Sequence, residues 1–202
     1  MKIYSGVQLG KGIFMAIKIF IDQGHNPSGV NTGAEGNGLK EQDITYEVGR
    51  RLFNLLSANP NFEARLSRPT EETVLGTSNT TSLRERVYLA NSWPADYFLS
   101  IHTNGSTNPS ANGTEVYVYR EDSPAYFLGL DILNAIVERM GTRNRGVREN
   151  PSLYVLRNTD MPAVLIELAY ISNFEDSQKL KNDPQGFAQA IYNGLLRYFD
   201  LA

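Results

Sequence analysis

The chain has 202 residues, a length that favours one domain burying roughly 70% of its unfolded surface, and its hydrophobic (41%) and charged (20%) fractions are ordinary for a globular protein. Its formal net charge of −3 gives no support to nucleic-acid binding, because domains that bind nucleic acids usually carry a basic patch. The chain has no cysteine, which excludes disulfides, thiolate nucleophiles and Cys-based zinc sites, so any metal would need His and carboxylate ligands.

The first apolar stretch, residues 13–21, has the length of a signal-peptide core, but Lys18 interrupts it and no small-residue cleavage site follows. We interpret this stretch as leading into the first strand, and residues 1–14 as an extension ahead of Met15. Residues 15–202 are then one domain, because no linker rich in Pro, Ser or Gly divides them. No segment approaches the ~20 apolar residues that a membrane span needs.

Strands and helices alternate in the first half of the chain. Short β-branched and aromatic runs ended by turn residues predict strands, and apolar residues three or four apart predict helices. The predicted strands are Lys18–Asp22, Phe62–Ser67 and Tyr97–His102; the predicted helices are one capped by Asp43, with Ile44, Val48, Leu52 and Leu55 as its apolar face, and a short one over Leu83–Asn91.

The second half continues the alternation. The predicted strands are Thr114–Tyr119, Leu153–Arg157 and Ala163–Leu168; the predicted helices are one that starts at Ser123, with Tyr126, Leu130, Leu133 and Val137 on one face, and a closing helix with Phe187, Ile191 and Leu195. This pattern predicts a single α/β domain with a mostly parallel six-stranded sheet flanked by helices.

Both histidines of the chain, His25 and His102, follow hydrophobic runs that we predict as strands. The carboxyl ends of parallel strands meet at one edge of a sheet, so these two imidazoles are expected to be neighbours. Two acids in the loop and helix start after His25 could join them, Glu35 and Glu41, and the adjacent helix start modestly favours Glu41. A His, Glu, His set is typical of a catalytic zinc site, whereas Asp22 is either an indirect partner of His25 or a turn residue.

Glu167 ends the apolar run Ala-Val-Leu-Ile-Glu, which we place at the centre of the sheet. Burying an unpaired carboxylate costs several kcal/mol, so this residue needs a cation, a metal or a proton. One interpretation is a structural salt bridge, for example to Arg157. The other places Glu167 beside the metal as the general base that takes a proton from water and returns it to a leaving amine.

The remaining polar residues carry weaker signals. Asn104 lies two residues beyond His102 and would share its face, where it could bind substrate, orient a histidine or simply end the strand. Ser172 and Asn173 are typical of a turn and a helix start. Four arginines are expected to be solvated and receive no role: Arg68, Arg84, Arg86 and Arg148.

A series of short motifs runs along the chain from about Ile17 onward. They are Asp22-Gln23-Gly24-His25, Gly38-Leu39-Lys40-Glu41-Gln42-Asp43, Leu66-Ser67-Arg68, Leu83 with Arg86, Ala90-Asn91, Ser100-Ile101-His102-Thr103-Asn104, Gly113-Thr114-Glu115, Arg145-Gly146-Val147, Leu153-Tyr154-Val155-Leu156-Arg157, Met161-Pro162 leading to Glu167, and Ser172-Asn173. In these motifs and their order the chain resembles the zinc-dependent N-acetylmuramoyl-L-alanine amidases of the amidase-3 type. Two places depart from the family pattern, Asn26-Pro27 and Leu168-Ala169-Tyr170.

The resemblance implies a zinc ion held by His25, Glu41 and His102, with Glu167 as the catalytic acid/base. It also implies a phosphorylase/hydrolase-like fold over residues 15–202 and cleavage of the amide between N-acetylmuramic acid and L-alanine in peptidoglycan. A zinc peptidase or deacylase, and a non-catalytic peptidoglycan-binding module, are the alternatives. With no recognisable signal peptide, we expect either a cytoplasmic enzyme released by lysis, like an endolysin, or a chain whose leader has been removed.

Overall fold

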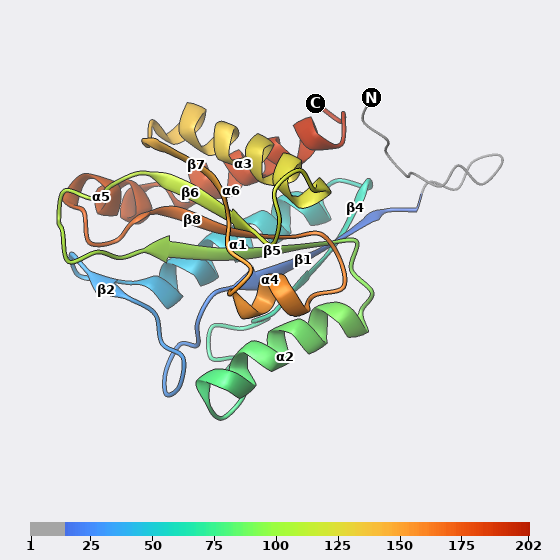
Figure 1. Ribbon diagram of the computed structural model, residues 1–202, viewed down its shortest axis with the longest axis horizontal. Coiled ribbons are helices and arrows are strands. Elements are labelled where there is room, and N and C mark those ends of the chain that lie inside the picture. Colours follow the sequence, from blue (N-terminus) through green and yellow to red (C-terminus); the bar gives the residue numbers. More distant parts are fainter. Residues whose placement is uncertain (1–14) are drawn as a thin grey trace.

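The structure is a computed structural model that describes residues 15–202, so the predicted extension over residues 1–14 lies outside the described residues. Six strands form one sheet in the order β4-β1-β5-β8-β6-β7 (Figure 1). Their bounds are Ile17–Gln23 (β1), Phe62–Leu66 (β4), Tyr97–Asn104 (β5), Thr114–Val118 (β6), Asn144–Glu149 (β7) and Ala163–Tyr170 (β8). A small hairpin of Glu35–Gly36 (β2) and Leu39–Lys40 (β3) lies outside this sheet.

Every neighbouring pair in the six-stranded sheet is parallel except β6 with β8. The predicted α/β class and mostly parallel sheet are therefore confirmed. The three central strands β1, β5 and β8 end at the same edge, and His102 on β5 is paired in register with Glu167 on β8. This edge is where an open α/β sheet gathers side chains that are distant in sequence.

Helices cover both faces of the sheet (Figure 1). On one face α1, α3 and α6 pack together and bury the larger apolar cluster, and on the other α2 and α4 cover a smaller cluster around Phe20, Trp93 and Phe98. The helices are Glu41–Ser57 (α1), Asn79–Ser92 (α2), Pro124–Met140 (α3), Tyr154–Asn158 (α4), Phe174–Asn182 (α5) and Pro184–Tyr198 (α6). Apolar burial on both faces is the main stabilising term and holds the strand ends rigidly.

One predicted strand is wrong. Most residues of the predicted strand Leu153–Arg157 belong instead to the short helix α4. The reason is that Val155 and Leu156 are buried by packing of α4 on the sheet face, which gives an apolar run without strand pairing. The sixth strand of the sheet is β7, which was not predicted and pairs in parallel with β6 at the sheet edge. Strand β7 was missed because its residues are mostly polar or charged and are partly exposed, as those of edge strands often are. No range was predicted for helix α5, although Ser172 and Asn173 indicated a helix start at this point.

Two helix descriptions also need correction. Helix α1 begins at Glu41, so Asp43 lies in its first turn and is not its cap, and Leu56 is buried where Leu55 was expected. In α3 the cap is Ser123 and Leu133 is buried, both as predicted, but Leu130 is exposed and the other large buried residues are Leu128, Ile132 and Ile136. The apolar residues surround much of α3, so their spacing did not identify a single face. The closing helix α6 buries Phe187, Ile191 and Leu195 as predicted.

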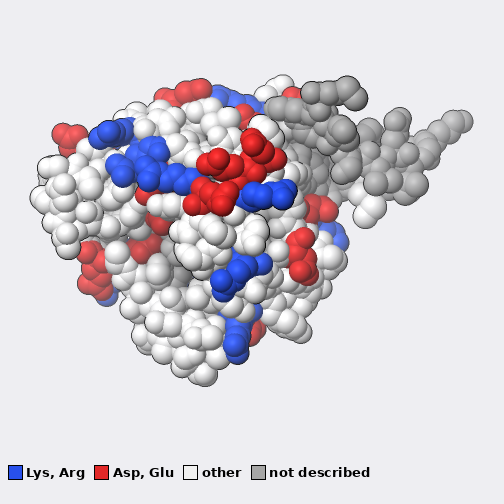
Figure 2. Space-filling model, in the orientation of Figure 1, with Lys and Arg blue, Asp and Glu red and all other residues white. Residues whose placement is uncertain are grey.

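The surface shows charges of both signs. On the face drawn in Figure 2, Lys and Arg side chains are interspersed with Asp and Glu, without an extended patch of one sign. Among residues 15–202, none of the helices is both long enough and apolar enough to cross a membrane.

Gly194 lets α6 approach α3 closely, and we expect its replacement by alanine to destabilise the fold. A Cβ atom there would lie 2.6 Å from the Cα of Ile132, which is backbone that cannot rotate away. Gly194→Ala should therefore lower the free energy of unfolding by about 1–3 kcal/mol, as overpacking does. Chemical denaturation measures this; Asn193→Ala, on the half-buried neighbouring position, should stay within about 0.5–1 kcal/mol of the wild type. Equal effects of the two variants would contradict the close packing.

Candidate metal centre

Three predicted site residues come together at the carboxyl end of the sheet. His25 follows β1, Glu41 is the first residue of α1 and His102 lies on β5. One potential ligand atom from each lies within 4.8 Å of the others. His25 Nε2 is 3.1 Å from Glu41 Oε2, and His102 Nδ1 is 3.0 Å from Glu41 Oε1. The acid that joins the histidines is thus Glu41, while Glu35 lies on the exposed hairpin strand β2.

His25 has an unusual backbone. Its φ angle is +68°, in the left-handed region that non-glycine residues seldom adopt. The conformation turns the chain out of β1 and directs the imidazole toward Glu41. The ring Nδ1 lies 3.3 Å from the carbonyl oxygen of Asn31, to which it can donate, and Nε2 lies on the side of Glu41. Fixing one ring nitrogen in this way orients the other nitrogen as a metal ligand.

Glu41 is a buried carboxylate held by several donors. Besides the two imidazoles, the backbone N–H groups of Ala34 and Thr103 donate to its two oxygens, each at 2.9 Å. Burial raises the pKa of the Glu41 carboxyl, but the hydrogen bonds from His102 and His25 outweigh burial, so the pKa lies well below its usual range. Glu41 is therefore ionised and presents a fixed negative charge to the centre.

Two glycines allow the backbone to lie against these side chains. A Cβ atom on Gly24 would be 2.5 Å from Cε1 of His102, and a Cβ atom on Gly33 would be 2.6 Å from Cβ of Glu41. Any larger residue at either position would displace a potential ligand. Gly24 in the first sequence motif and Gly33 in the loop that follows it therefore have a steric function at this centre.

Glu167 opens onto the same cleft, which has a volume of about 530 Å³ and also contains His25, Glu41 and His102. Its Oε2 atom is buried, and no donor in residues 15–202 bonds to it. The structural salt bridge to Arg157 is not formed, because Arg157 is exposed on α4. Burial, together with repulsion from the Glu41 and Glu115 carboxylates, raises the pKa of Glu167 to about 8. Glu167 is thus a half-buried residue whose Oε2 atom is buried and has no ion-pair partner among residues 15–202, and it lines a cleft together with three potential ligands.

The raised pKa predicts a pH-dependent cost in stability. Between its ordinary pKa near 4.5 and about 8, the unfolded state loses the Glu167 proton while the folded state keeps it, so this residue makes the metal-free protein less stable as pH rises. Removing the charge by Glu167→Gln should raise the unfolding free energy of the metal-free protein at pH 8 by about 1–3 kcal/mol and change it little at pH 4. Denaturation at several pH values in chelator measures this difference. Parallel pH profiles for variant and wild type would contradict the raised pKa.

A second buried acid, Glu115 on β6, was not selected from the sequence. It is paired in register with Glu167 and accepts from Arg145 Nε at 3.1 Å and from the Tyr117 hydroxyl at 3.1 Å. The side-chain amide of Asn104 also donates to Glu115, so Asn104 lines the cleft but is held by an acid rather than by a histidine. The sequence did contain a signal for Glu115, because it is a glutamate within the strand Thr-Glu-Val-Tyr-Val. The same pattern, a glutamate in an apolar strand, identified Glu167.

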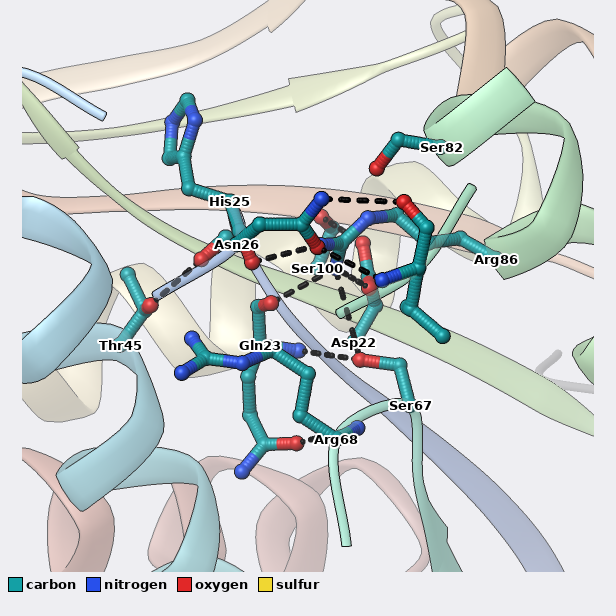
Figure 3. A network of polar contacts seen from close by, with 12 residues as sticks. Asp22, Gln23, His25, Asn26, Thr45, Ser67, Arg68, Ser82, Arg86 and Ser100 are labelled. Carbon is teal, nitrogen blue, oxygen red and sulfur yellow. Dashed lines mark hydrogen bonds and ion pairs between the residues drawn. The ribbon is translucent and has the colours of Figure 1, made fainter. Parts of the chain in front are cut away.

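The expectation that the four arginines are solvated is wrong for Arg68 and Arg86, which are fully buried. Figure 3 shows Arg86 among Asp22, Gln23 and the backbone of His25, and Arg68 beside Gln23. Asp22 accepts from Arg86 and from the Ser100 hydroxyl and does not bond to the His25 ring. Asn173 caps α5, as its helix-start pattern predicted, and the Ser172 hydroxyl accepts from the Ser106 backbone at the cleft rim.

The donor set suits zinc. Two imidazoles and one carboxylate are a ligand set that catalytic zinc sites use, leaving a position for water. Donor atoms around a tetrahedral zinc lie about 3.3 Å apart, given Zn–N and Zn–O distances near 2.0–2.1 Å. The two histidines lie 3.1 and 3.0 Å from different oxygens of Glu41, and one ligand atom from each of the three residues lies within 4.8 Å of the others. Residues His25, Glu41 and His102 could therefore hold one such ion.

The chain is similar to known proteins over nearly its whole described length. Residues 19–197 match the family model described as N-acetylmuramoyl-L-alanine amidase. The chain is 39% identical over 190 residues to the N-acetylmuramoyl-L-alanine amidase CwlM of Bacillus licheniformis, covering 92% of this chain and 70% of that protein. It is 37% identical to the amidase LytC of Bacillus subtilis (strain 168) over 90% of this chain, but spans only 35% of LytC. A crystal structure of an N-acetylmuramoyl-L-alanine amidase from Clostridium difficile 630 superimposes with a TM-score of 0.81 at 31% identity, covering 92% of this chain and 97% of that one.

Proposed function

Because the chain belongs to the amidase-3 family of N-acetylmuramoyl-L-alanine amidases, we propose that it hydrolyses its substrate as a zinc enzyme, with His25, Glu41 and His102 as metal ligands and Glu167 as the catalytic acid/base. The family reaction is hydrolysis of the peptidoglycan amide that joins the lactyl group of N-acetylmuramic acid to L-alanine. As a member of this family, the chain is a cell-wall hydrolase. We further propose that residues 15–202 are the catalytic domain, since the family match spans residues 19–197.

Zinc bound by these residues would supply Lewis acidity that polarises the scissile carbonyl and lowers the pKa of a water molecule from 15.7 towards about 7. The protein would supply the proton transfers. The Glu167 carboxylate accepts a proton from the attacking water, and the same oxygen then donates it to the nitrogen of L-alanine as the C–N bond breaks. The products are a lactyl carboxylate and a stem peptide with a free amino terminus.

The observation that most supports this assignment is the environment of Glu167. A buried carboxyl group with a raised pKa and no ion-pair partner costs stability, as would be expected of a group kept for its chemistry. A divalent cation in the same cleft would favour its ionised form and bring its pKa nearer to the operating pH, where a general base is most effective. Asn104, fixed by Glu115 at the cleft wall, is proposed to bind substrate.

Mass spectrometry of digested cell-wall fragments tests the reaction. We expect purified peptidoglycan to release stem peptides that begin with a free L-alanine amino group, and a metal chelator to stop this release. Cleavage inside the stem peptide would instead indicate a peptidase, and binding without release would indicate a non-catalytic module. Whether lysis or removal of a leader brings the chain to the wall stays a prediction.

A further inference from the structure

We propose that Arg86 is a positioning residue for the first metal ligand, in that its guanidinium holds the His25 backbone in the left-handed conformation that directs the imidazole to the metal. The inference rests on the proposed zinc site. Arg86 lies on α2 and is not one of the three potential ligands. Its guanidinium bonds to backbone carbonyl groups beside the first of them, His25 (Figure 3).

The contacts of Arg86 are short and directed at the chain around His25. Nη1 donates to the carbonyl oxygen of Gln23 at 2.6 Å, and Nη2 donates to the carbonyl oxygen of His25 itself at 2.6 Å. One rigid guanidinium therefore bridges two carbonyl groups on either side of Gly24. Because the fork of an arginine is planar, it fixes the relative orientation of the two peptide groups that it joins.

The backbone that Arg86 bridges needs such support. His25 has a φ angle of +68°, and a non-glycine residue persists in that region only when its surroundings over-determine it. Other hydrogen bonds in this turn include one from the backbone N–H of Asn26 to the carbonyl of Asn31 at 2.9 Å and one from the Thr45 hydroxyl to the Gly24 carbonyl at 2.7 Å. Neither of these bonds holds the His25 carbonyl.

Asp22 provides the counter-charge that offsets the cost of burying Arg86. Its Oδ1 accepts from Arg86 Nη1 at 2.5 Å, and its Oδ2 accepts from the Ser100 hydroxyl at 2.7 Å. Both charged side chains are about 1% exposed. Ser100 lies on β5 two residues before His102, so the pair also connects the strand of the second histidine to the turn of the first.

This arrangement predicts an effect on metal affinity that is separate from an effect on stability. A ligand that is already oriented loses little freedom when the metal binds. Removal of a group that orients a metal ligand typically weakens metal affinity by about 10–100-fold. We therefore expect Arg86→Met, in the full chain, to raise the zinc dissociation constant by about 10–100-fold, measured by competition with a chromophoric chelator well below the unfolding temperature.

Two further variants separate positioning from general destabilisation. Arg84→Met removes an exposed arginine from the same helix and should leave the zinc dissociation constant within about two-fold of the wild type. Asp22→Asn combined with Arg86→Met leaves no unpaired buried charge, so it should fold more stably than Arg86→Met alone. It still lacks the bridge to the His25 carbonyl, and it should therefore keep the weakened zinc affinity.

The outcomes distinguish this inference from the proposed function. Wild-type protein that fails to bind one zinc per chain would overturn the proposed metal site. Wild-type protein that binds zinc normally, together with a double variant of unchanged zinc affinity, would overturn the role of Arg86 alone. The positioning role is supported if Arg86→Met weakens zinc affinity and if the double variant, although more stable than Arg86→Met, keeps the weakened zinc affinity.

Discussion

Glu167→Gln is expected to lower kcat/KM for the muramyl-peptide amide by at least about 10²-fold, the contribution typical of a general acid/base. Glutamine keeps the shape of the side chain but neither accepts a proton from water nor returns one to the leaving amine. Because Glu167 is not one of the three clustered ligands, the variant should retain stoichiometric zinc. Release of free-amino stem peptides, with elemental analysis of the same sample, measures both properties.

The control for this variant is Glu63→Gln, which neutralises an exposed glutamate on the edge strand β4. It changes the net charge by the same amount and should leave the reaction unchanged. Wall cleavage by Glu167→Gln at the wild-type rate would exclude Glu167 as the acid/base. Loss of zinc from this variant would show instead that Glu167 is a ligand.

His102→Ala is expected to abolish both stoichiometric zinc binding and amide cleavage. The substitution removes one of three ligands and leaves Glu41 without the hydrogen bond from His102 Nδ1 at 3.0 Å. With two protein ligands left, zinc affinity should fall by at least about 10²-fold. Loss of a group that only orients a ligand already weakens metal affinity by about 10–100-fold, and loss of a ligand itself should weaken it more. Elemental analysis after dialysis measures the metal content.

Glu35→Ala is the matched variant for this experiment, because Glu35 was the competing acid in the sequence and lies at the rim of the same cleft. Its removal should leave one zinc per chain. Zinc content unchanged in His102→Ala would exclude His102 as a ligand. A loss of zinc in Glu35→Ala would return that residue to the ligand set.

The sequence was most informative where local pattern and sheet topology agree. Short buried runs placed β1, β5 and β8 within a residue or two of their observed bounds, and both histidines and Glu167 follow or end such runs. Because parallel strands deliver their carboxyl ends to one edge, three of the four proposed site residues could be brought together before any coordinates. The choice of Glu41 over Glu35 depended on the family resemblance, since spacing alone favoured it only modestly.

Burial of charge was the part that local pattern did not reveal. Arg68 and Arg86 have the local surroundings of solvated helix or loop residues, and contacts distant in sequence, such as Arg86 with Asp22 and Arg68 with Gln42, bury them. The partners of Glu115 likewise come from other strands, with Asn104 on β5 and Arg145 on β7. The misassigned segment 153–157 has the same cause, because an apolar run records burial but not whether its neighbours are strands or helices.

X-ray anomalous scattering from zinc-loaded crystals is the most direct test of the four-residue centre. The account predicts one zinc peak per chain, in contact with side-chain atoms of His25, Glu41 and His102, with the Glu167 carboxyl facing the ion but outside its ligand set. A zinc peak elsewhere in the molecule, or one bound without His25 and His102, would contradict it.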